Sequence, residues 1–310
     1  MKSIKLNYNE IPPEENEFVD IIADITHQCN MTCKNCYIPN RDIPDMDLDR
    51  FKDFMSRLGG KAFVRIMGAE PTVSPNCAEF IRAVYDYGKA NKHSCTLVTN
   101  GLRLSHMSYL EKLFDAGLRH VVLSMNGVDN DDWYEAIDEM RCAEKKVKAL
   151  RNCRDKKLNI NTGTVIVPGI NEDAPAALKE LIDRENIRNV LMRIKNVGQV
   201  GRYQKETDEN VKLEGLVKLC ADQFGVSEDY IWSFHGVPYY NKFNEPNTIL
   251  FPLREGSKTF NRGRWVKITN WDTENDSGIP DPGSKRRGRV TQDFNLAPFY
   301  EHLKENEGGY

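Results

Sequence analysis

The sequence predicts an α/β protein whose core is a sheet of parallel strands. Strand-like and helix-like segments alternate six times within the first 200 residues. Each strand-like segment is an apolar, β-branched run that ends in glycine or a polar turn. Consecutive parallel strands require right-handed crossovers through helices. The pattern is compatible with two arrangements of the sheet: a doubly wound open sheet, or a complete or partial barrel.

The individual elements follow from the same periodicities. Asp47 and Asp173 directly precede helical patterns and are expected to be N-caps. The expected helices cover residues 48–58, 77–91, 106–116, 130–156 and 173–184. The expected strands cover residues 19–26, 61–68, 94–101, 120–127, 159–169 and 189–198.

The rhythm changes after about residue 200, which divides the chain into an N-terminal extension (1–18), a strand–helix domain (19–200) and a C-terminal region (201–310). The last region contains a charged helical pattern at 208–224. Two short segments, 248–253 and 265–271, are expected to pair as a hairpin. A basic run at 285–289 and a short helix at 297–306 follow. We expect this region to cap the mouth of the barrel.

Composition excludes several classes of protein. Lys and Arg number 43 against 46 Asp and Glu, a net charge of −3, which argues against a dedicated nucleic-acid binder. No apolar run approaches the roughly 20 residues of a membrane span. The first residues lack the apolar segment of a signal peptide, so we expect a cytoplasmic protein.

Polar and turn-forming residues follow several of the expected strands. The carboxyl ends of parallel strands meet at one edge of a sheet or at one mouth of a barrel, where active sites gather. The sequence therefore predicts a single site at these ends. The segments concerned are 68–71, 99–101, 124–127 and 168–171.

Three cysteines lie within eight residues after the first strand. Cys29, Cys33 and Cys36 have the spacing CxxxCxxC, and the other five cysteines are scattered. Three thiolates on one loop can converge on a soft metal centre. A structural zinc site needs a fourth ligand, which His27 is able to supply, and three unconnected thiols are a further alternative. Three sulfurs suit a cubane iron–sulfur cluster that leaves one iron open.

The cysteine motif and the segment Gly68-Ala69-Glu70-Pro71 together resemble the radical S-adenosylmethionine (radical SAM) superfamily. The resemblance covers about residues 19–200 and implies a partial (βα)6 TIM-type barrel. It implies that Cys29, Cys33 and Cys36 bind a [4Fe-4S] cluster whose open iron binds S-adenosylmethionine. Reductive cleavage of this cosubstrate releases a 5′-deoxyadenosyl radical, which abstracts hydrogen from a substrate.

The resemblance also implies a cosubstrate site. Residues 68–71 match the segment that binds the methionine amino group, although Ala69 replaces a glycine. Alternatives stay open: Glu70 as an N-cap, Ser124 and Asn126 as partners of backbone groups, and Arg193 as an ion-pair residue. The expected cosubstrate residues are Tyr37, Gly68, Ala69, Glu70, Pro71, Asn100, Ser124, Asn126, Val167 and Arg193.

The substrate is expected to be a small polar metabolite, as in natural-product biosynthesis. Beyond residue 153 the chain has a single cysteine, Cys220, so an auxiliary cluster is not expected. Without such a cluster to accept an electron, reactions that leave the oxidation state of the substrate unchanged overall fit best. An external donor of the flavodoxin or ferredoxin type would supply the electron. His235, Tyr239 and Tyr240 are catalytic candidates. A peptide substrate and a non-catalytic metal-binding module are the alternatives; nucleic-acid and membrane partners are not expected.

Overall fold

The computed structural model describes residues 10–36, 41–91, 93–197, 212–237, 247–253, 265–270 and 287–298. All six expected strands of the first 200 residues are present, and each lies parallel to the next. Their bounds lie inside the expected ranges. The strands are β1 Asp20–Asp24, β2 Phe63–Met67, β3 Ser94–Thr99, β4 His120–Ser124, β5 Asn159–Ile166 and β6 Val190–Asn196.

The helices also follow the expected pattern, with one division. The expected helix 130–156 is two helices, because Glu139 takes a left-handed conformation and ends the first. Asp47 caps α1 by accepting a hydrogen bond from the Arg50 amide, as predicted. Asp173 caps nothing, since its carboxylate accepts a hydrogen bond from Gln223 instead. The helices are α1 Leu48–Arg57, α2 Cys77–Asn91, α3 Met107–Asp115, α4 Asp131–Asp138, α5 Ala143–Asp155, α6 Ala174–Arg184, α7 Leu213–Phe224 and α8 Glu228–Trp232; short 3-10 turns lie at Pro13–Glu15, Pro71–Val73 and Leu102–Ser105.

Strands from the C-terminal region extend the sheet at both edges. β7 (Thr248–Pro252) and β8 (Trp265–Thr269) form the predicted antiparallel hairpin, and β8 lies parallel to β6. β9 (Arg287–Val290) lies parallel to β1, and β10 (Leu296–Pro298) pairs with β9. The prediction of a helix at 297–306 is therefore wrong for its first two residues, which belong to β10. These strands are part of the sheet. A region that only capped the mouth of the barrel would not pair with its strands.

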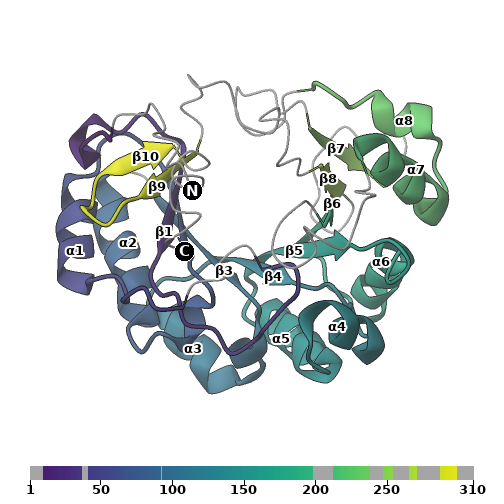
Figure 1. Cartoon of the computed structure of the whole chain (residues 1–310), viewed down its shortest axis with the longest axis horizontal. Helices are drawn as coiled ribbons and strands as arrows, with labels where there is room; N and C mark the ends of the chain where they lie inside the picture. The colour runs from purple at the N-terminus through teal and green to yellow at the C-terminus, as the bar shows by residue number, and fades with distance from the viewer. Residues whose placement is uncertain are drawn as a thin grey trace, which may run out of the picture.

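The ten strands form one curved sheet with the order β10-β9-β1-β2-β3-β4-β5-β6-β8-β7. Figure 1 shows the sheet as an open ring with the helices on its outer side. Its ends, β10 and β7, do not pair with each other. This is the partial barrel that the sequence resemblance implied.

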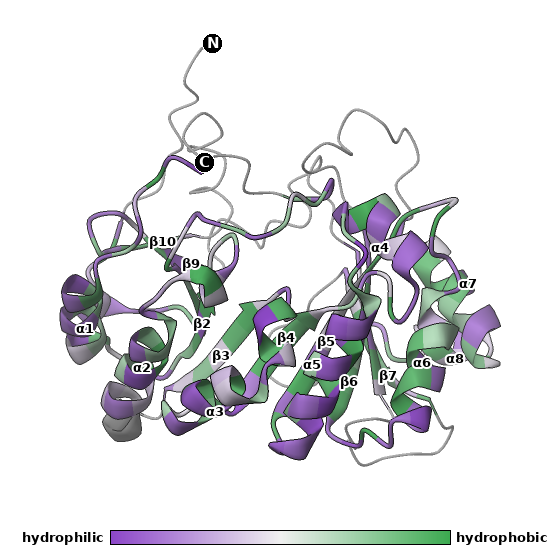
Figure 2. Ribbon diagram, turned by 90° about the horizontal axis from the view of Figure 1, so that it is seen from below, coloured by the Kyte–Doolittle hydropathy of each residue, from purple (hydrophilic) through white to green (hydrophobic). Residues whose placement is uncertain are grey.

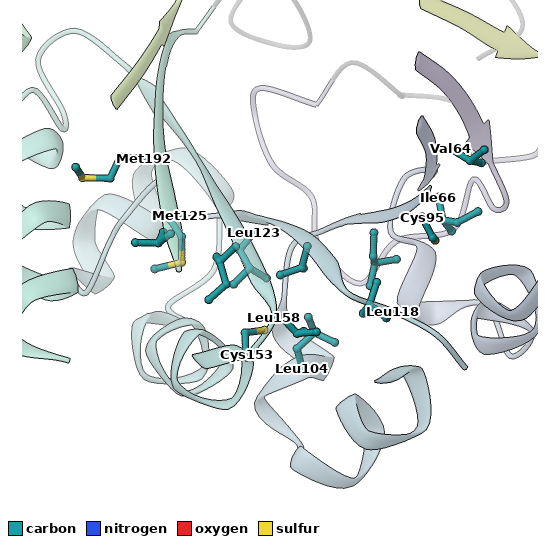
Figure 3. Packing of buried hydrophobic residues seen from close by; sticks show 14 of the residues in the cluster. Val64, Ile66, Cys95, Leu104, Leu118, Leu123, Met125, Cys153, Leu158 and Met192 are labelled. Atoms are coloured by element: carbon teal, nitrogen blue, oxygen red, sulfur yellow. The ribbon is translucent and has the colours of Figure 1, made fainter. Parts of the chain in front are cut away.

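The hydrophobic core lies between the sheet and the helices. Alternate residues of each strand point to opposite faces, and those on the outer face, such as Val64, Ile66, Leu123 and Met192, are buried against the helix layer. Figure 3 shows this packing, and Figure 2 shows polar residues on the outer surface of the helices. No described helix is both long and apolar enough to cross a bilayer. The inner face carries both polar side chains, such as Arg65 and Thr96, and apolar ones, such as Val98 and Val122.

Candidate cluster and cosubstrate site

The three motif cysteines lie on the loop that follows β1, and each is partly exposed. The Met31 amide donates to Cys29 Sγ at 3.4 Å, and the Cys36 amide donates to the Cys33 carbonyl at 3.2 Å. Arg41 Nη2 donates to Cys36 Sγ at 3.4 Å. Arg41 thus places a guanidinium beside one of the three thiols.

The surroundings of these thiols favour a bound cation. Burial raises the pKa of Cys29, and the carboxylate of Glu70 and the neighbouring Cys36 raise it further. Burial also raises the pKa of Cys33, with added contributions from Asp138 and Cys29. The cysteines are therefore close enough to oppose one another's ionisation. Iron at these sulfurs would reverse that effect, because a metal cation stabilises thiolates. The donor set thus fits an iron–sulfur cluster.

Among the described residues, no group of three or more His, Cys, Asp or Glu side chains is arranged to hold a single metal ion. In a cluster each thiolate binds a different iron, so the sulfurs stand farther apart.

The cysteine loop is bound to the carboxyl ends of the neighbouring strands. Asn100 Nδ2, after β3, donates to Asn30 Oδ1 at 2.8 Å. The Lys34 amide donates to the Ile137 carbonyl of α4 at 3.0 Å. These bonds place the thiols at the strand ends, where the sequence predicted the site.

Gly68 brings the end of β2 against the segment that follows β1. Its φ of +138° is a conformation that side chains rarely adopt, and an added Cβ would overlap the Thr26 carbonyl. The next two amides complete the approach: Ala69 donates to the Thr26 carbonyl and Glu70 to the Gln28 carbonyl, both at 3.0 Å. Pro71 then opens a 3-10 turn. The motif glycine is therefore required by backbone packing beside the cysteine loop.

Glu70 joins this turn to β3. Its side chain is fully buried and caps the 3-10 turn, as the alternative interpretation held. Oε1 accepts hydrogen bonds from the Thr72 amide at 3.0 Å and from the hydroxyls of Thr72 and Thr99 at 2.5 and 2.7 Å. Oε2 accepts from the Asn100 amide at 2.6 Å. By its lone pairs Oε2 can accept one further hydrogen bond, but the side chain has no exposed surface in this structure.

Asn126, after β4, is at the centre of a second buried network. Its Nδ2 donates to Asp138 Oδ1 at 2.9 Å, and its Oδ1 accepts from the Val165 amide at 3.1 Å. Lys146 Nζ donates to the Ser124 carbonyl at 3.0 Å. The side chain of Asn126 thus supports α4 and β5, again the structural alternative. Asp138 and Lys146 were not predicted from the sequence. Each is a charged residue on the buried side of an amphipathic helix, α4 or α5.

The segment after β5 is held by Asn171. Val167 is buried, and its amide donates to Asn171 Oδ1 at 2.7 Å. Asn171 Nδ2 donates to the Asn126 carbonyl at 2.9 Å. The end of β5 therefore joins the same network as the end of β4.

One predicted site residue lies away from the strand ends, and three others are not described. Arg193 lies in the middle of β6, in register with Lys267 of β8, and not at a strand end. Tyr37, Tyr239 and Tyr240 lie outside the described residues.

His235 does not belong to this site. It is exposed after α8, with its ring centroid 5.5 Å from that of Trp232. Tyr230 of α8 donates to the Pro252 carbonyl, and Phe234 contacts Trp265, the first residue of β8. This is the amino-terminal end of the parallel sheet, opposite the cysteine loop. The catalytic role of His235 stays a prediction that these contacts do not support.

The remaining cysteines are structural. All five are buried, and they lie on α2, β3, α7 and the start and end of α5. Cys142 packs in a small cluster with Met31 and Tyr134 against Cys29 and Cys33. No described set of them converges on a metal.

The sequence profile of the radical SAM superfamily matches residues 24–182, just over half of the chain. GTP 3′,8-cyclase of Paracoccus denitrificans is 27% identical over 170 residues, covering 53% of this chain and 48% of that protein. PqqA peptide cyclase of Methylorubrum populi is 27% identical over 177 residues, covering 56% of this chain and 41% of that protein. The chain thus spans about half the length of these curated relatives.

Solved structures agree on the fold. Streptococcus suis SuiB bound to the precursor peptide SuiA superposes with a TM-score of 0.61 at 14% identity, covering 94% of this chain and 62% of that one. The structure titled anSMEcpe with bound AdoMet gives a TM-score of 0.50 at 16% identity, covering 69% of this chain and 60% of that one.

Proposed function

Because the chain belongs to the radical SAM superfamily, we propose that it cleaves S-adenosylmethionine to abstract hydrogen from a small polar metabolite. Enzymes of this family use a [4Fe-4S] cluster and S-adenosylmethionine. When bound, the cluster would supply the electron that cleaves S-adenosylmethionine to methionine and a 5′-deoxyadenosyl radical able to take a hydrogen atom from the substrate. An external donor of the flavodoxin or ferredoxin type supplies that electron.

One observation carries the proposal: the loop with the three motif cysteines is hydrogen-bonded to Asn100, at the end of β3, through Asn30 and to α4 through Lys34. The cysteines concerned are Cys29, Cys33 and Cys36. In this assignment the three thiolates hold the cluster. The turn at Gly68–Pro71 receives the methionine amino group through its carbonyls and Glu70 Oε2. Asn100, Ser124, Asn126 and Val167 shape the remaining cosubstrate site, and Tyr37 contributes from outside the described residues.

The cysteine distribution supports an overall redox-neutral reaction. The five cysteines outside the motif are buried, and among the described residues they form no group that could hold a metal ion. We therefore assign no electron acceptor for the product radical to these cysteines. Rearrangement, elimination, decarboxylation, epimerisation and addition to a double bond all meet this condition. Tyr239 and Tyr240 stay candidates for quenching a product radical.

The test uses anaerobically reconstituted protein reduced with dithionite. We expect about four irons per chain, a reduced-cluster electron paramagnetic resonance signal that changes on addition of S-adenosylmethionine, and formation of 5′-deoxyadenosine. Cys33→Ala should abolish all three, whereas Cys220→Ala, the same change at a buried cysteine of α7, should keep them. A full iron content without any 5′-deoxyadenosine would instead favour the non-catalytic metal-binding module.

A peptide substrate has one observation in its favour, the similarity to PqqA peptide cyclases. The two alternatives separate when 5′-deoxyadenosine formation is measured with the dialysable and retained fractions of a cell extract. Stimulation by the dialysable fraction supports a small metabolite. Stimulation confined to the retained, protease-sensitive fraction would replace the metabolite with a peptide.

A further inference from the structure

Arg41 joins the two ends of the loop that carries the motif cysteines. Its Nη1 donates a hydrogen bond to the His27 carbonyl at 3.2 Å, and Gln28 Nε2 donates to the Arg41 carbonyl at 2.8 Å. The two bonds run in opposite directions between residues 27–28, before the first motif cysteine, and residue 41, after the third. Contacts within the chain itself therefore fix the position of this guanidinium.

The segment just after Arg41 is attached to the end of β1 as well. The Met46 amide donates to the Ile25 carbonyl at 3.0 Å, and Thr26 Oγ1 donates to Asp45 Oδ1 at 2.5 Å. Residues 25–28 and 41–46 are thus held together by hydrogen bonds. A donor that is fixed in this way needs little reorganisation when negative charge develops beside it.

The other terminal nitrogen of Arg41 contacts a motif thiol. Nη2 donates to Cys36 Sγ at 3.4 Å, and both side chains are half-buried. Cys29 Sγ, by contrast, accepts from a neutral group, the Met31 amide, also at 3.4 Å. A guanidinium stays protonated at every pH that the folded chain meets. Cys36 therefore has a fixed positive charge beside its sulfur.

The charge of Arg41 extends beyond Cys36. Burial raises the pKa of Cys29, and the charge of Arg41 acts against that increase. The acids nearest the loop act in the opposite direction to Arg41, Glu70 on Cys29 and Asp138 on Cys33. Arg41 thus offsets nearby negative charge from the Cys36 side of the loop.

The sign of the effect on a cluster follows from its charge. Reduction adds one negative charge to the group that the three thiolates would hold. A hydrogen bond or a positive charge at a ligand sulfur stabilises the more negative state, and so raises the reduction potential. A guanidinium beside Cys36 therefore makes reduction by an external donor easier.

We propose that Arg41 is a positioning residue that acts through the Cys36 sulfur to raise the reduction potential of the cluster. The proposal deepens the function proposed above and rests on it. A hydrogen bond to a charged group changes an equilibrium by about ten-fold or more. Because Arg41 is only half-buried, solvent screens its charge, and we expect the lower end of that range. Ten-fold corresponds to about 59 mV for the transfer of one electron.

The test is a redox titration of the anaerobically reconstituted holoenzyme, followed by electron paramagnetic resonance without S-adenosylmethionine. Arg41→Met and Arg41→Gln remove the charge, and Arg41→Lys keeps it. The matched control is Arg188→Gln, an exposed arginine before β6 whose Nε donates to Asn186. We expect a midpoint about 59 mV more negative in the two neutral Arg41 variants. Arg41→Lys should recover part of this shift, and the control should match the wild type.

Iron per chain is measured on the same samples, because Arg41→Met also loses the bond to the His27 carbonyl. Arg41→Gln keeps a neutral donor at this position and supplies the midpoint if Arg41→Met loads no iron. A purely structural role would lower the iron content without moving the midpoint of the clusters that form, and this result would overturn the proposal. An equal shift in Arg188→Gln, or no recovery in Arg41→Lys, would also overturn it.

The wild type separates the two proposals. A wild-type chain that forms no reducible cluster of about four irons, or no 5′-deoxyadenosine, refutes the proposed function. A wild-type cluster that does cleave S-adenosylmethionine, together with an unchanged midpoint in the neutral Arg41 variants, refutes the role of Arg41 alone.

Discussion

The buried carboxylate of Glu70 provides the sharpest test of how the site is held together. Its Oε1 accepts three hydrogen bonds and its Oε2 accepts one from the Asn100 amide. Glu70→Gln keeps the shape of the side chain but gives one end an NH₂ group. In either orientation that NH₂ faces a backbone N–H, of Thr72 or of Asn100, and a backbone N–H cannot turn away. The variant therefore loses charge-assisted bonds and gains a donor–donor contact.

The magnitude follows from the bonds that change. A hydrogen bond to a charged group contributes about 1.5–3 kcal/mol, and a buried donor left unsatisfied costs about 1–3 kcal/mol. We expect Glu70→Gln to lower the free energy of unfolding by about 3–5 kcal/mol. At about 2–4 °C per kcal/mol for domains of this size, the melting temperature should fall by at least about 6 °C. Oε2 also loses its negative charge, so S-adenosylmethionine should bind more weakly.

The assay pairs thermal unfolding with cosubstrate calorimetry. Glu79→Gln makes the same chemical change on the exposed side of α2, where the nearest partner is Lys112 at 3.9 Å. This control should stay within about 0.5 kcal/mol of the wild type. A Glu70→Gln protein as stable as Glu79→Gln would refute the structural reasoning. Weaker cosubstrate binding at unchanged stability would mean that Glu70 serves the ligand alone.

The remaining predictions concern the backbone and the inner face. Gly68→Ala should prevent cluster loading, measured as iron per chain, whereas Gly169→Ala, also at positive φ but with open space around it, should cost only about 1 kcal/mol of stability. Arg289→Met should destabilise the fold by about 3–5 kcal/mol in denaturant titrations, because Asp24 is left buried and charged, and Asp24→Asn should restore part of the loss in the double variant. Burial and neighbouring arginines lower the pKa of Lys195 to about 7, so between about 7 and the usual lysine value near 10.4 the unfolded chain holds a proton that the folded chain lacks. The contribution of Lys195 to the free energy of unfolding therefore rises with pH in that window. The amount by which Lys195→Met exceeds the wild type in free energy of unfolding should shrink by up to about 1 kcal/mol per pH unit. A constant difference between the two proteins from pH 7 to 10 would contradict the lowered pKa.

The barrel strands were predictable because their signals are local. Each of the six is an apolar run closed by a turn, and β3 begins at the expected residue. The cysteine loop and the Gly68 turn were equally predictable, because the residues of each motif lie within a few positions of one another in the sequence. The division of 130–156 into α4 and α5 was missed because Glu139 adopts a left-handed conformation that its residue type does not suggest.

The pairing of β9 with β1 was not predictable from local patterns, because more than 260 residues separate Asp24 from Arg289. Nothing in the basic run at 285–289 indicated burial. In the folded chain, Arg289 is fully buried instead. A retrospective signal does exist: Arg193-Ile194-Lys195 alternates charge with apolar residues at the strand period of two. That pattern indicates a strand with a polar inner face, and it needs no knowledge of the fold.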